Sequence, residues 1–393
     1  MYQRKTVFLL GAGASRGLGL PTSVELLSRI REWARQETLP HARQTVEGVI
    51  EAYSRYNEHF NFEDLLTAVN SLAHREENEI WPLVATLKEP FEAIMKMQPE
   101  LFVSLYQAMW GFIRSQLTVT YGDGQEWSYL RNLINIARET DTPSIFTLNY
   151  DLSLEAVMEA ASIKYSTGFM SEPSYSSEVQ WWPLWLLRGD DAVKFNNTPD
   201  GENADVHLIK LHGSLDWFRV EAPVLSTVEG YQIYPQGPII RSNSTPDNII
   251  EEVMIAGRVG KQKLEEPFIT LLREFYNEVS KADVLIIIGY SFSDPHINRI
   301  LLDTLMRVRI YDIIVVNGLR WPLNADGIDF MLANYMSDEA ETTWSTLCHR
   351  YDMVSEYDAC ISVLPYYAEE AINEGHLQST LKEIWKIHRA LES

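Results

Sequence analysis

Short apolar segments alternate with helix-forming segments along the chain. The short segments are rich in branched residues, are apolar on both faces and each end at a small or polar residue: Val7–Leu10 before Gly11, Ser144–Leu148 before Asn149, Val206–Leu211 before His212, Val284–Ile288 before Gly289, and Ile313–Val316 before Asn317. Strands that are apolar on both faces are typical of parallel sheets covered by helices. The pattern therefore predicts an α/β fold, a Rossmann-like parallel sheet with helices on both faces.

Helical periodicity is concentrated between the first two of these strands. Apolar residues recur at i, i+3, i+4 and i+7 in three segments: Val46, Val49, Ile50 and Tyr53; Phe62, Leu65, Leu66 and Val69; Phe102, Leu105, Tyr106, Met109 and Ile113. This spacing gives a helix one apolar stripe. We expect a helical insertion over 31–120 in a core formed by 1–30 and 121–330, and a helical C-terminal extension over 331–393.

Two segments have the composition of loops. Residues 168–204 and 221–262 hold clusters of Gly, Pro, Ser, Asn and Asp, which favour turns. The first also contains the sequence Trp-Trp-Pro-Leu-Trp at 181–185. These tryptophans either pack against each other locally or form a lid or a partner contact, and the sequence leaves both interpretations open.

Composition narrows the classes of partner and compartment. The 33 basic and 55 acidic residues give a net charge of −22, which argues against direct binding of nucleic acid because that binding depends on many Lys and Arg contacts to phosphate. A basic partner protein fits better. The two cysteines suit a reducing cytoplasm, and no apolar run approaches the roughly 20 residues of a membrane-spanning helix. We expect a cytoplasmic protein that does not enter a membrane.

The first candidate site is the sequence Gly-Ala-Gly-Ala-Ser at 11–15, which follows a strand and precedes a helix signal at 21–26. A strand, a Gly-x-Gly turn and a helix together let backbone amides approach a pyrophosphate. The third glycine of the usual dinucleotide pattern is absent. Taken alone, the turn is as typical of a structural glycine loop as of a phosphate site.

Polar residues also follow the next strands. The sequence Thr-Leu-Asn-Tyr-Asp ends at Asp151, and Leu-His-Gly-Ser surrounds His212. Ligands of open α/β sheets bind beyond the carboxyl ends of such strands. Taken singly, Asn149 and Asp151 also fit a helix N-cap, and His212 fits a hydrogen-bonded loop histidine.

A further strand end carries Gly-Tyr-Ser at 289–291, followed by Asp294 and His296. Gly289 permits close approach of the backbone, and Ser291 can hydrogen-bond a ribose or a phosphate. Asp294 and His296 suggest a catalytic dyad, but a cap of the following helix is the simpler interpretation.

As an ordered set, these motifs resemble the sirtuin-like superfamily, and more closely the sirtuin-like proteins of bacterial anti-phage defence. The set is Gly-Ala-Gly-Ala-Ser, Thr-x-Asn-Tyr-Asp, Leu-His-Gly-Ser, Gly-Tyr-Ser and Val-Asn, and it covers roughly 5–30 and 125–320. The resemblance implies a Rossmann-type sheet with NAD⁺ as substrate across the strand ends.

The resemblance also implies a role for each matched residue. The phosphates are expected at Gly11, Ala12, Gly13 and Ser15, the nicotinamide ribose at Thr147, Asn149 and Asp151, the catalytic imidazole at His212 beside Gly213, and the adenosine side at Gly289, Ser291 and Asn317. Asn149 and His212, with Asp151, are the expected catalytic residues.

One departure from the family bears on activity. Sirtuin protein deacylases resemble one another in a small domain built on a four-cysteine zinc site, and two cysteines cannot form one. The defence relatives are NAD⁺ hydrolases, some in large complexes with a HerA-type ATPase. We therefore expect a metal-free NAD⁺ glycohydrolase in a homo-oligomer, with a HerA-type ATPase as a possible partner. A zinc-less deacylase and a non-catalytic NAD⁺- or ADP-ribose-binding module are the alternatives.

Overall fold

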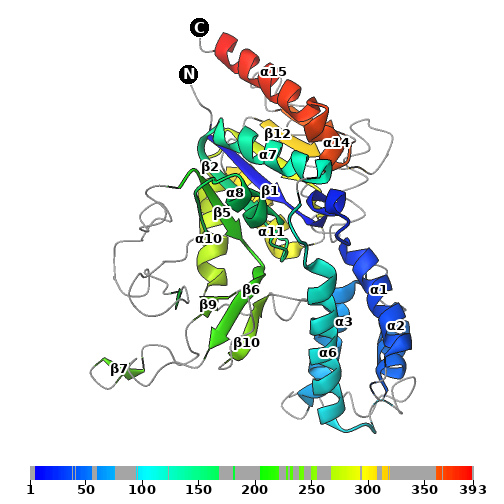
Figure 1. Cartoon of the computed structure of the whole chain (residues 1–393). Coiled ribbons are helices and arrows are strands. Elements are labelled where there is room, and N and C mark those ends of the chain that lie inside the picture. Colours follow the sequence, from blue (N-terminus) through cyan, green and yellow to red (C-terminus); the bar gives the residue numbers. More distant parts are fainter. Residues whose placement is uncertain are drawn as a thin grey trace. The chain divides into compact units, whose positions relative to one another are not determined.

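The computed structural model of the chain contains one seven-stranded sheet in which every pair of neighbouring strands is parallel (Figure 1). Across the sheet the order is β13 (Cys360–Leu364), β12 (Asp312–Val316), β11 (Val284–Ile288), β1 (Lys5–Leu10), β2 (Asp141–Thr147), β5 (Val206–Lys210) and β3 (Tyr165–Ser166). The chain proceeds from β1 to one side and returns on the other, so the order reverses at β1.

The structure describes residues 5–37, 39, 41–54, 60–75, 94, 96–122, 124–167, 180–181, 204–220, 227–228, 231–232, 239–242, 249–254, 267–292, 294–307, 312–316, 318, 360–364 and 366–391. Their contacts divide them into two compact units. The first comprises the described parts of Met1–Gly19, Val119–Met254 and Glu265–Ser393, and the second lies within Leu20–Thr118.

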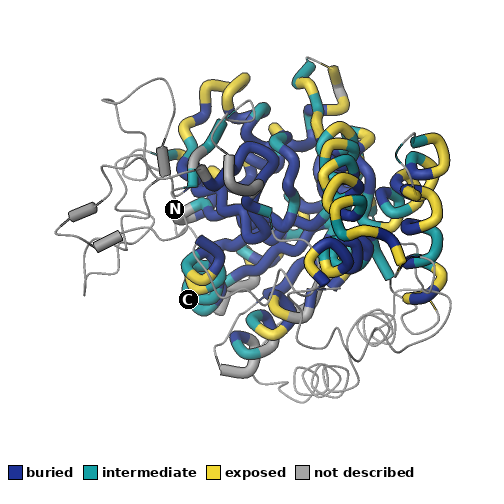
Figure 2. Tube along the Cα trace, turned by 90° about the horizontal axis from the view of Figure 1, so that it is seen from below, coloured by how far each residue is buried: buried dark blue, intermediate teal, exposed yellow. Residues whose placement is uncertain are grey.

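In the first unit, helices cover both faces of the sheet. Alternate strand residues such as Phe8, Ile145 and Ile286 form one core with α7 (Ser128–Arg138), α8 (Ser153–Ala160), α14 (Ala368–Asn373) and α15 (His376–Leu391). On the opposite face Phe146 packs edge-on against Phe275 of α10 (Phe268–Val279), with ring centroids 5.0 Å apart. Strands β5, β11 and β12 are buried at every position, and β1 is buried at every position but its first. Figure 2 marks the buried residues in dark blue. The predicted parallel sheet with helices on both faces is confirmed.

The second unit is helical, as the periodicity of that region predicts. It contains α1 (Ser23–Gln36), α2 (Ala42–Ser54), α3 (Phe62–Ala73) and α6 (Pro99–Leu117). Most residues of the apolar stripes are buried, with Val46, Val49, Leu65 and Met109 each at 0% exposure, but Tyr53 at the end of α2 is 41% exposed. Helix α1 begins with a capping box between Thr22 and Glu25, so the helix after the glycine loop belongs to this unit and not to the sheet.

Two parts of the first unit differ from the sequence-based expectation. The region expected to be a purely helical extension supplies β13, an edge strand of the sheet, before α14 and α15. The two regions expected to be irregular supply β4 (Gln180–Trp181), β9 (Ile239–Arg241) and β10 (Ile249–Met254), which form an antiparallel sheet with β6 (Gly213–Val220). Of the tryptophan cluster only Trp181 is described, and residues 182–185 lie outside the described residues.

Candidate active site at the strand ends

The loop after β1 packs directly against the loop after β11. The amide of Gly13 donates to the carbonyl of Gly289 at 2.9 Å, and the amide of Ala14 donates to the carbonyl of Gly11 at 2.9 Å. A Cβ on Gly13 would lie 2.8 Å from the Cα of Gly289, and a Cβ on Gly289 would lie 2.3 Å from the nitrogen of Ala14. The glycines therefore allow these two loops to meet, whatever the loops bind.

This packing changes which groups of the loop remain for phosphate. The amides of Gly13 and Ala14 already have acceptors within the protein, and so has the amide of Ser15, which donates to the carbonyl of Ala12 at 3.2 Å. A pyrophosphate at this loop would thus need other donors than these three amides. Phosphate binding by Gly11, Ala12, Gly13 and Ser15 stays a prediction.

Asn149 ties the end of β2 to the glycine loop. Its Nδ2 donates to the carbonyl of Gly11 and to the Oγ of Ser15, both at 3.0 Å. Its backbone amide donates to the Oγ1 of Thr147 at 3.1 Å, at the last position of the strand. Because these bonds use both hydrogens of the carboxamide, a half-buried Asn149 has its Oδ1, an acceptor, to offer a ligand.

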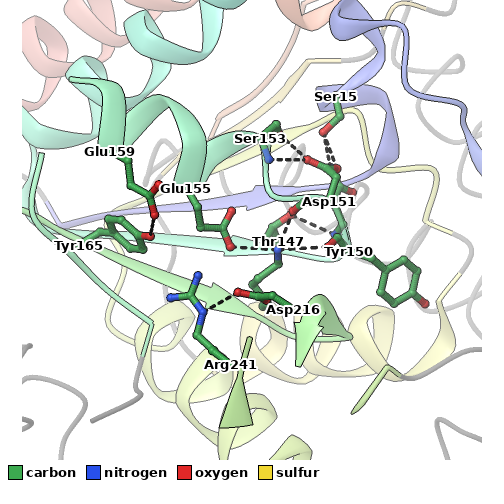
Figure 3. Close-up of polar contacts among 12 residues, drawn as sticks. Ser15, Thr147, Tyr150, Asp151, Ser153, Glu155, Glu159, Tyr165, Asp216 and Arg241 are labelled. Atoms are coloured by element: carbon green, nitrogen blue, oxygen red, sulfur yellow. Dashed lines mark hydrogen bonds and ion pairs between the residues drawn. The ribbon is translucent and has the colours of Figure 1, made fainter. Parts of the chain in front are cut away.

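Asp151 lies beneath this loop and connects it to α8 (Figure 3). Its Oδ2 accepts from the Oγ of Ser15 at 3.0 Å. Its Oδ1 accepts from the amide of Ser153 at 3.1 Å and from the Ser153 hydroxyl. Asp151 precedes Leu152, the N-cap residue of α8, so it is not itself the N-cap, but its buried carboxylate accepts from the first residue of the helix. A direct catalytic role of Asp151 stays a prediction.

His212 follows β5, the neighbour of β2, and the ends of these strands are joined by the Leu211 amide, which donates to the Thr147 carbonyl at 2.9 Å. The ring of His212 is buried and lies beside Tyr150, with centroids 6.3 Å apart. Its Nε2 lies 2.8 Å from the Oδ2 of Asp294. The structure therefore brings the predicted Asn149 and His212 to neighbouring strand ends.

Asp294 is the residue of this site that the sequence assigned to a different role. It precedes α11 (Pro295–Arg307), and its Oδ1 accepts from the amides of His296 and Ile297 at 2.9 and 3.3 Å. The predicted helix cap is therefore present. The side chain of His296 is exposed. The second carboxylate oxygen of Asp294 therefore faces the ring of His212 and not the ring of His296.

Of the four remaining predicted residues, the structure describes three. Gly213 has φ +87°, and a Cβ on it would lie 2.1 Å from the carbonyl oxygen of Val253, so close packing of β6 on β10 requires this glycine. Gly289, with φ +62°, and an exposed Ser291 lie on the loop after β11. Asn317 lies outside the described residues. Ligand binding by these four residues stays a prediction.

A buried group of charges underlies the site, and sequence reasoning missed it. The Nζ of Lys210 donates to the carbonyls of Tyr150 and Asp151 at 3.3 and 2.6 Å and lies 3.0 Å from the Oε1 of Glu155. Lys210 is 1% exposed. It therefore braces the loop that carries Asn149. Its only sequence signal is a lysine at the end of a strand that is otherwise apolar except for His207.

The acids of this group respond to burial in opposite ways. Burial raises the pKa of Glu155, and the charge of Lys210 only partly opposes it. Burial also acts to raise the pKa of Asp216, but the charges of Arg241 and Lys210 outweigh it and lower that pKa. The Nε of Arg241 lies 2.6 Å from the Oδ2 of Asp216, and Figure 3 draws this pair. Two buried acids and two basic side chains thus balance one another beneath the site.

Two further observations concern only the part of the chain that the structure describes. Within it, no group of three or more His, Cys, Asp or Glu side chains is placed to hold a metal ion. Among its helices, none combines the length and the apolar character that crossing a membrane requires.

The chain was compared with protein families and with solved structures. The family of SIR2-like domains matches residues 143–309. Among solved structures, a Sir2 homologue mutant in complex with 2′-O-acetyl ADP-ribose is 14% identical, with a TM-score of 0.41 over 97% of this chain and 94% of that chain. A Sir2 homologue–NAD complex is also 14% identical, with a TM-score of 0.36 over 96% and 91%. Similarities this distant carry no inference about activity, and no curated protein matches the chain.

The family match covers the ends of β2, β5 and β11 with Asn149, His212 and Asp294, whereas the glycine loop lies before it. Three of the five motifs that carry the sequence resemblance therefore fall within it. Residues 143–309, which are less than half of the chain, match the family model of SIR2-like domains.

Proposed function

We propose that this protein is an NAD⁺ glycohydrolase, which converts NAD⁺ and water to ADP-ribose, nicotinamide and a proton. The observation that carries the proposal is the position of Asn149 and of His212, whose Nε2 lies 2.8 Å from Asp294, at the ends of neighbouring strands in the region that matches SIR2-like domains. Ligands of open α/β sheets bind outside the carboxyl ends of the strands, next to the point where the strand order reverses. Here that point lies between β1 and its neighbours.

The side chains supply what the reaction needs. Cleavage of the nicotinamide–ribose bond releases a neutral pyridine and leaves cationic character on the sugar. The Oδ1 of Asn149 can accept from a ribose hydroxyl or from the attacking water, because the glycine loop holds the other end of the carboxamide. His212 can take the proton that this water or hydroxyl gives up. Such acid–base assistance contributes about 10²–10⁴-fold, so positioning of the ribose must supply much of the rest.

Variants of the two central residues test the assignment. Asn149→Ala and His212→Ala should each reduce nicotinamide release by at least about 10²-fold, while thermal unfolding shows that the protein stays folded. Asn135→Ala on the exposed face of α7 and His74→Ala at the end of α3 are matched controls, because both side chains are exposed. Wild-type turnover by a folded Asn149 or His212 variant would remove that residue from the site.

The resemblance to defence proteins extends the proposal to a biological role. We propose that the enzyme works in the cytoplasm, depletes NAD⁺ in infected cells and is restrained until then in a homo-oligomer, with a HerA-type ATPase as partner. The net charge of −22 suits a more basic partner.

Mass photometry of the pure protein reports the homo-oligomer. Co-purification with the ATPase should weaken from 0.1 M to 1 M salt, because the Debye length falls from about 10 Å to about 3 Å. A monomer that hydrolyses NAD⁺ constitutively and binds no ATPase would contradict the restraint and leave the site assignment standing.

A further inference from the structure

The two carboxylate oxygens of Asp294 contact different groups. Oδ1 accepts from the first amides of α11, those of His296 and Ile297. Oδ2 lies 2.8 Å from the Nε2 of His212, and the side chains of Asp294 and His212 are only 4% and 7% exposed. A helix N-terminus favours a negative charge, so the position of Asp294 supports a carboxylate facing the imidazole.

The loop around Asp294 holds this carboxylate in place. The hydroxyl of Tyr290 accepts from the amide of Asp294 at 3.3 Å and donates to the Oδ1 of Asn298 at 2.8 Å. The Nδ2 of Asn298 in turn donates to the carbonyl of Phe292 at 2.6 Å, and Phe292 has φ +55°. These side chains are buried. These contacts hold the backbone at Asp294, and the amides of His296 and Ile297 hold its carboxylate.

We propose that Asp294 is a positioning residue that fixes the tautomer and the orientation of His212. The Nε2 of His212 and the Oδ2 of Asp294 lie 2.8 Å apart without the angle of a hydrogen bond, and the negative charge of the carboxylate favours a proton on Nε2, which leaves Nδ1 as the nitrogen that can accept a proton. The same carboxylate stabilises the imidazolium that forms when Nδ1 takes that proton. This inference rests on the proposed function, because His212 is the base of that reaction.

Two substitutions separate positioning from helix capping. Asp294→Asn keeps the size and the capping oxygen but turns an amide towards His212, which makes Nε2 an acceptor and places the proton on Nδ1. Asp294→Ser keeps a good N-cap but is too short to reach the ring. Asn61→Ser at the capping box of α3 is the matched control for exchanging a cap.

Both Asp294 variants should lower kcat for nicotinamide release at least about 10²-fold, with KM changed less than about twofold because neither variant alters the expected NAD⁺ contacts. Melting temperatures should stay close to that of Asn61→Ser. The ¹⁵N resonances of His212, assigned with a His212→Asn variant, should show an unprotonated Nδ1 in the wild type above pH 8 and a protonated Nδ1 in Asp294→Asn.

The outcomes distinguish this inference from the proposed function. Wild-type kcat in both Asp294 variants, with an inactive His212→Ala, would overturn the positioning role alone. A wild-type His212 with its proton on Nδ1 would overturn it as well, and this measurement needs no turnover. Absence of nicotinamide release from the wild type would instead defeat the proposed function, and the resonances would still decide the role of Asp294 towards His212.

Discussion

At Gly289 the loops of the site leave no room for a side chain, and the backbone is left-handed. Its φ is +62°, and a Cβ would lie 2.3 Å from the nitrogen of Ala14. Gly19 shares the conformation with φ +78° but has no atom within 4 Å of its Cβ position. Substitution of Gly19 therefore tests backbone strain alone, whereas substitution of Gly289 tests backbone strain together with a steric clash.

Gly19→Ala should cost about 1–2 kcal/mol of unfolding free energy, the strain of a left-handed alanine. Gly289→Ala should cost clearly more, because the glycine loop must also move. Urea unfolding of both variants measures the difference. Equal losses would mean that the two loops do not meet as described. The same contact makes Gly13→Val an unsuitable test of phosphate binding, since the variant would displace Gly289 whether or not a phosphate binds.

His207 of β5 gives the fold a dependence on pH. Burial lowers the pKa of its imidazole below the ordinary value of 6.5, although Glu278 partly opposes this. The unfolded chain therefore takes up a proton at higher pH than the folded protein does. The stabilisation is fully present above pH 6.5 and is lost as the pH falls below that value.

His207→Gln should consequently make the unfolding free energy less dependent on pH between about 6.5 and 5. His74→Gln, at an exposed histidine, is the control for the exchange of a histidine for a glutamine. Chemical unfolding at a series of pH values gives the comparison. The same slope in the wild type and in His207→Gln would show that this histidine does not titrate differently on folding.

At the residue scale, the sequence predicts what is local. Asn149 and His212 follow buried strands, and parallel strands of one sheet end at one edge, so their proximity follows from the strand pattern. The partner of His212 could not be predicted in this way. Asp294 shows a local signal for its capping role only, because its contact with His212 joins segments far apart in the sequence.

At the scale of elements, the end of β5 rests on one buried ion pair. Lys210 and Glu155 are 1% and 5% exposed, whereas Lys281 pairs with Glu278 at a position where the lysine is 61% exposed. Breaking a buried pair leaves an uncompensated charge, while a surface pair contributes little.

Lys210→Met should therefore cost about 3–5 kcal/mol, and Lys281→Met less than about 1 kcal/mol. Lys210→Met with Glu155→Leu should regain part of the loss but not all of it, since the carbonyls of Tyr150 and Asp151 lose their donor. Unfolding free energies of these variants give the test. A Lys210→Met protein as stable as Lys281→Met would show that the pair does not support the loop.

The elements that the sequence predicts best are those with a strong period or a long apolar run. The five central strands and the helices of the second unit are of this kind. Strands β3, β4 and β9 have only two or three residues, too few to show a period, and their place depends on pairing with distant segments. Strand β13 follows the same logic, as an edge strand whose five residues are defined by pairing with β12.

At the scale of the whole molecule, the core and the helical unit divide close to where the sequence pattern changes. The expected core boundary at residue 30 lies inside α1, while the compact units divide between Gly19 and Leu20. The boundary differs because α1, the helix that directly follows the glycine loop, belongs to the helical second unit and not to the core. The C-terminal segment joins the sheet because β13 completes its edge.

The central claim is that water, and not an acylated lysine, accepts the ADP-ribosyl group. The most direct measurement is chromatographic separation of the products after the pure protein, alone and together with the ATPase, is incubated with NAD⁺ in the presence and absence of an acetylated peptide. The account predicts equal amounts of nicotinamide and ADP-ribose without peptide, and the same yield with it. Nicotinamide release that strictly requires the peptide, or saturable NAD⁺ binding with no product under any of these conditions, would contradict it.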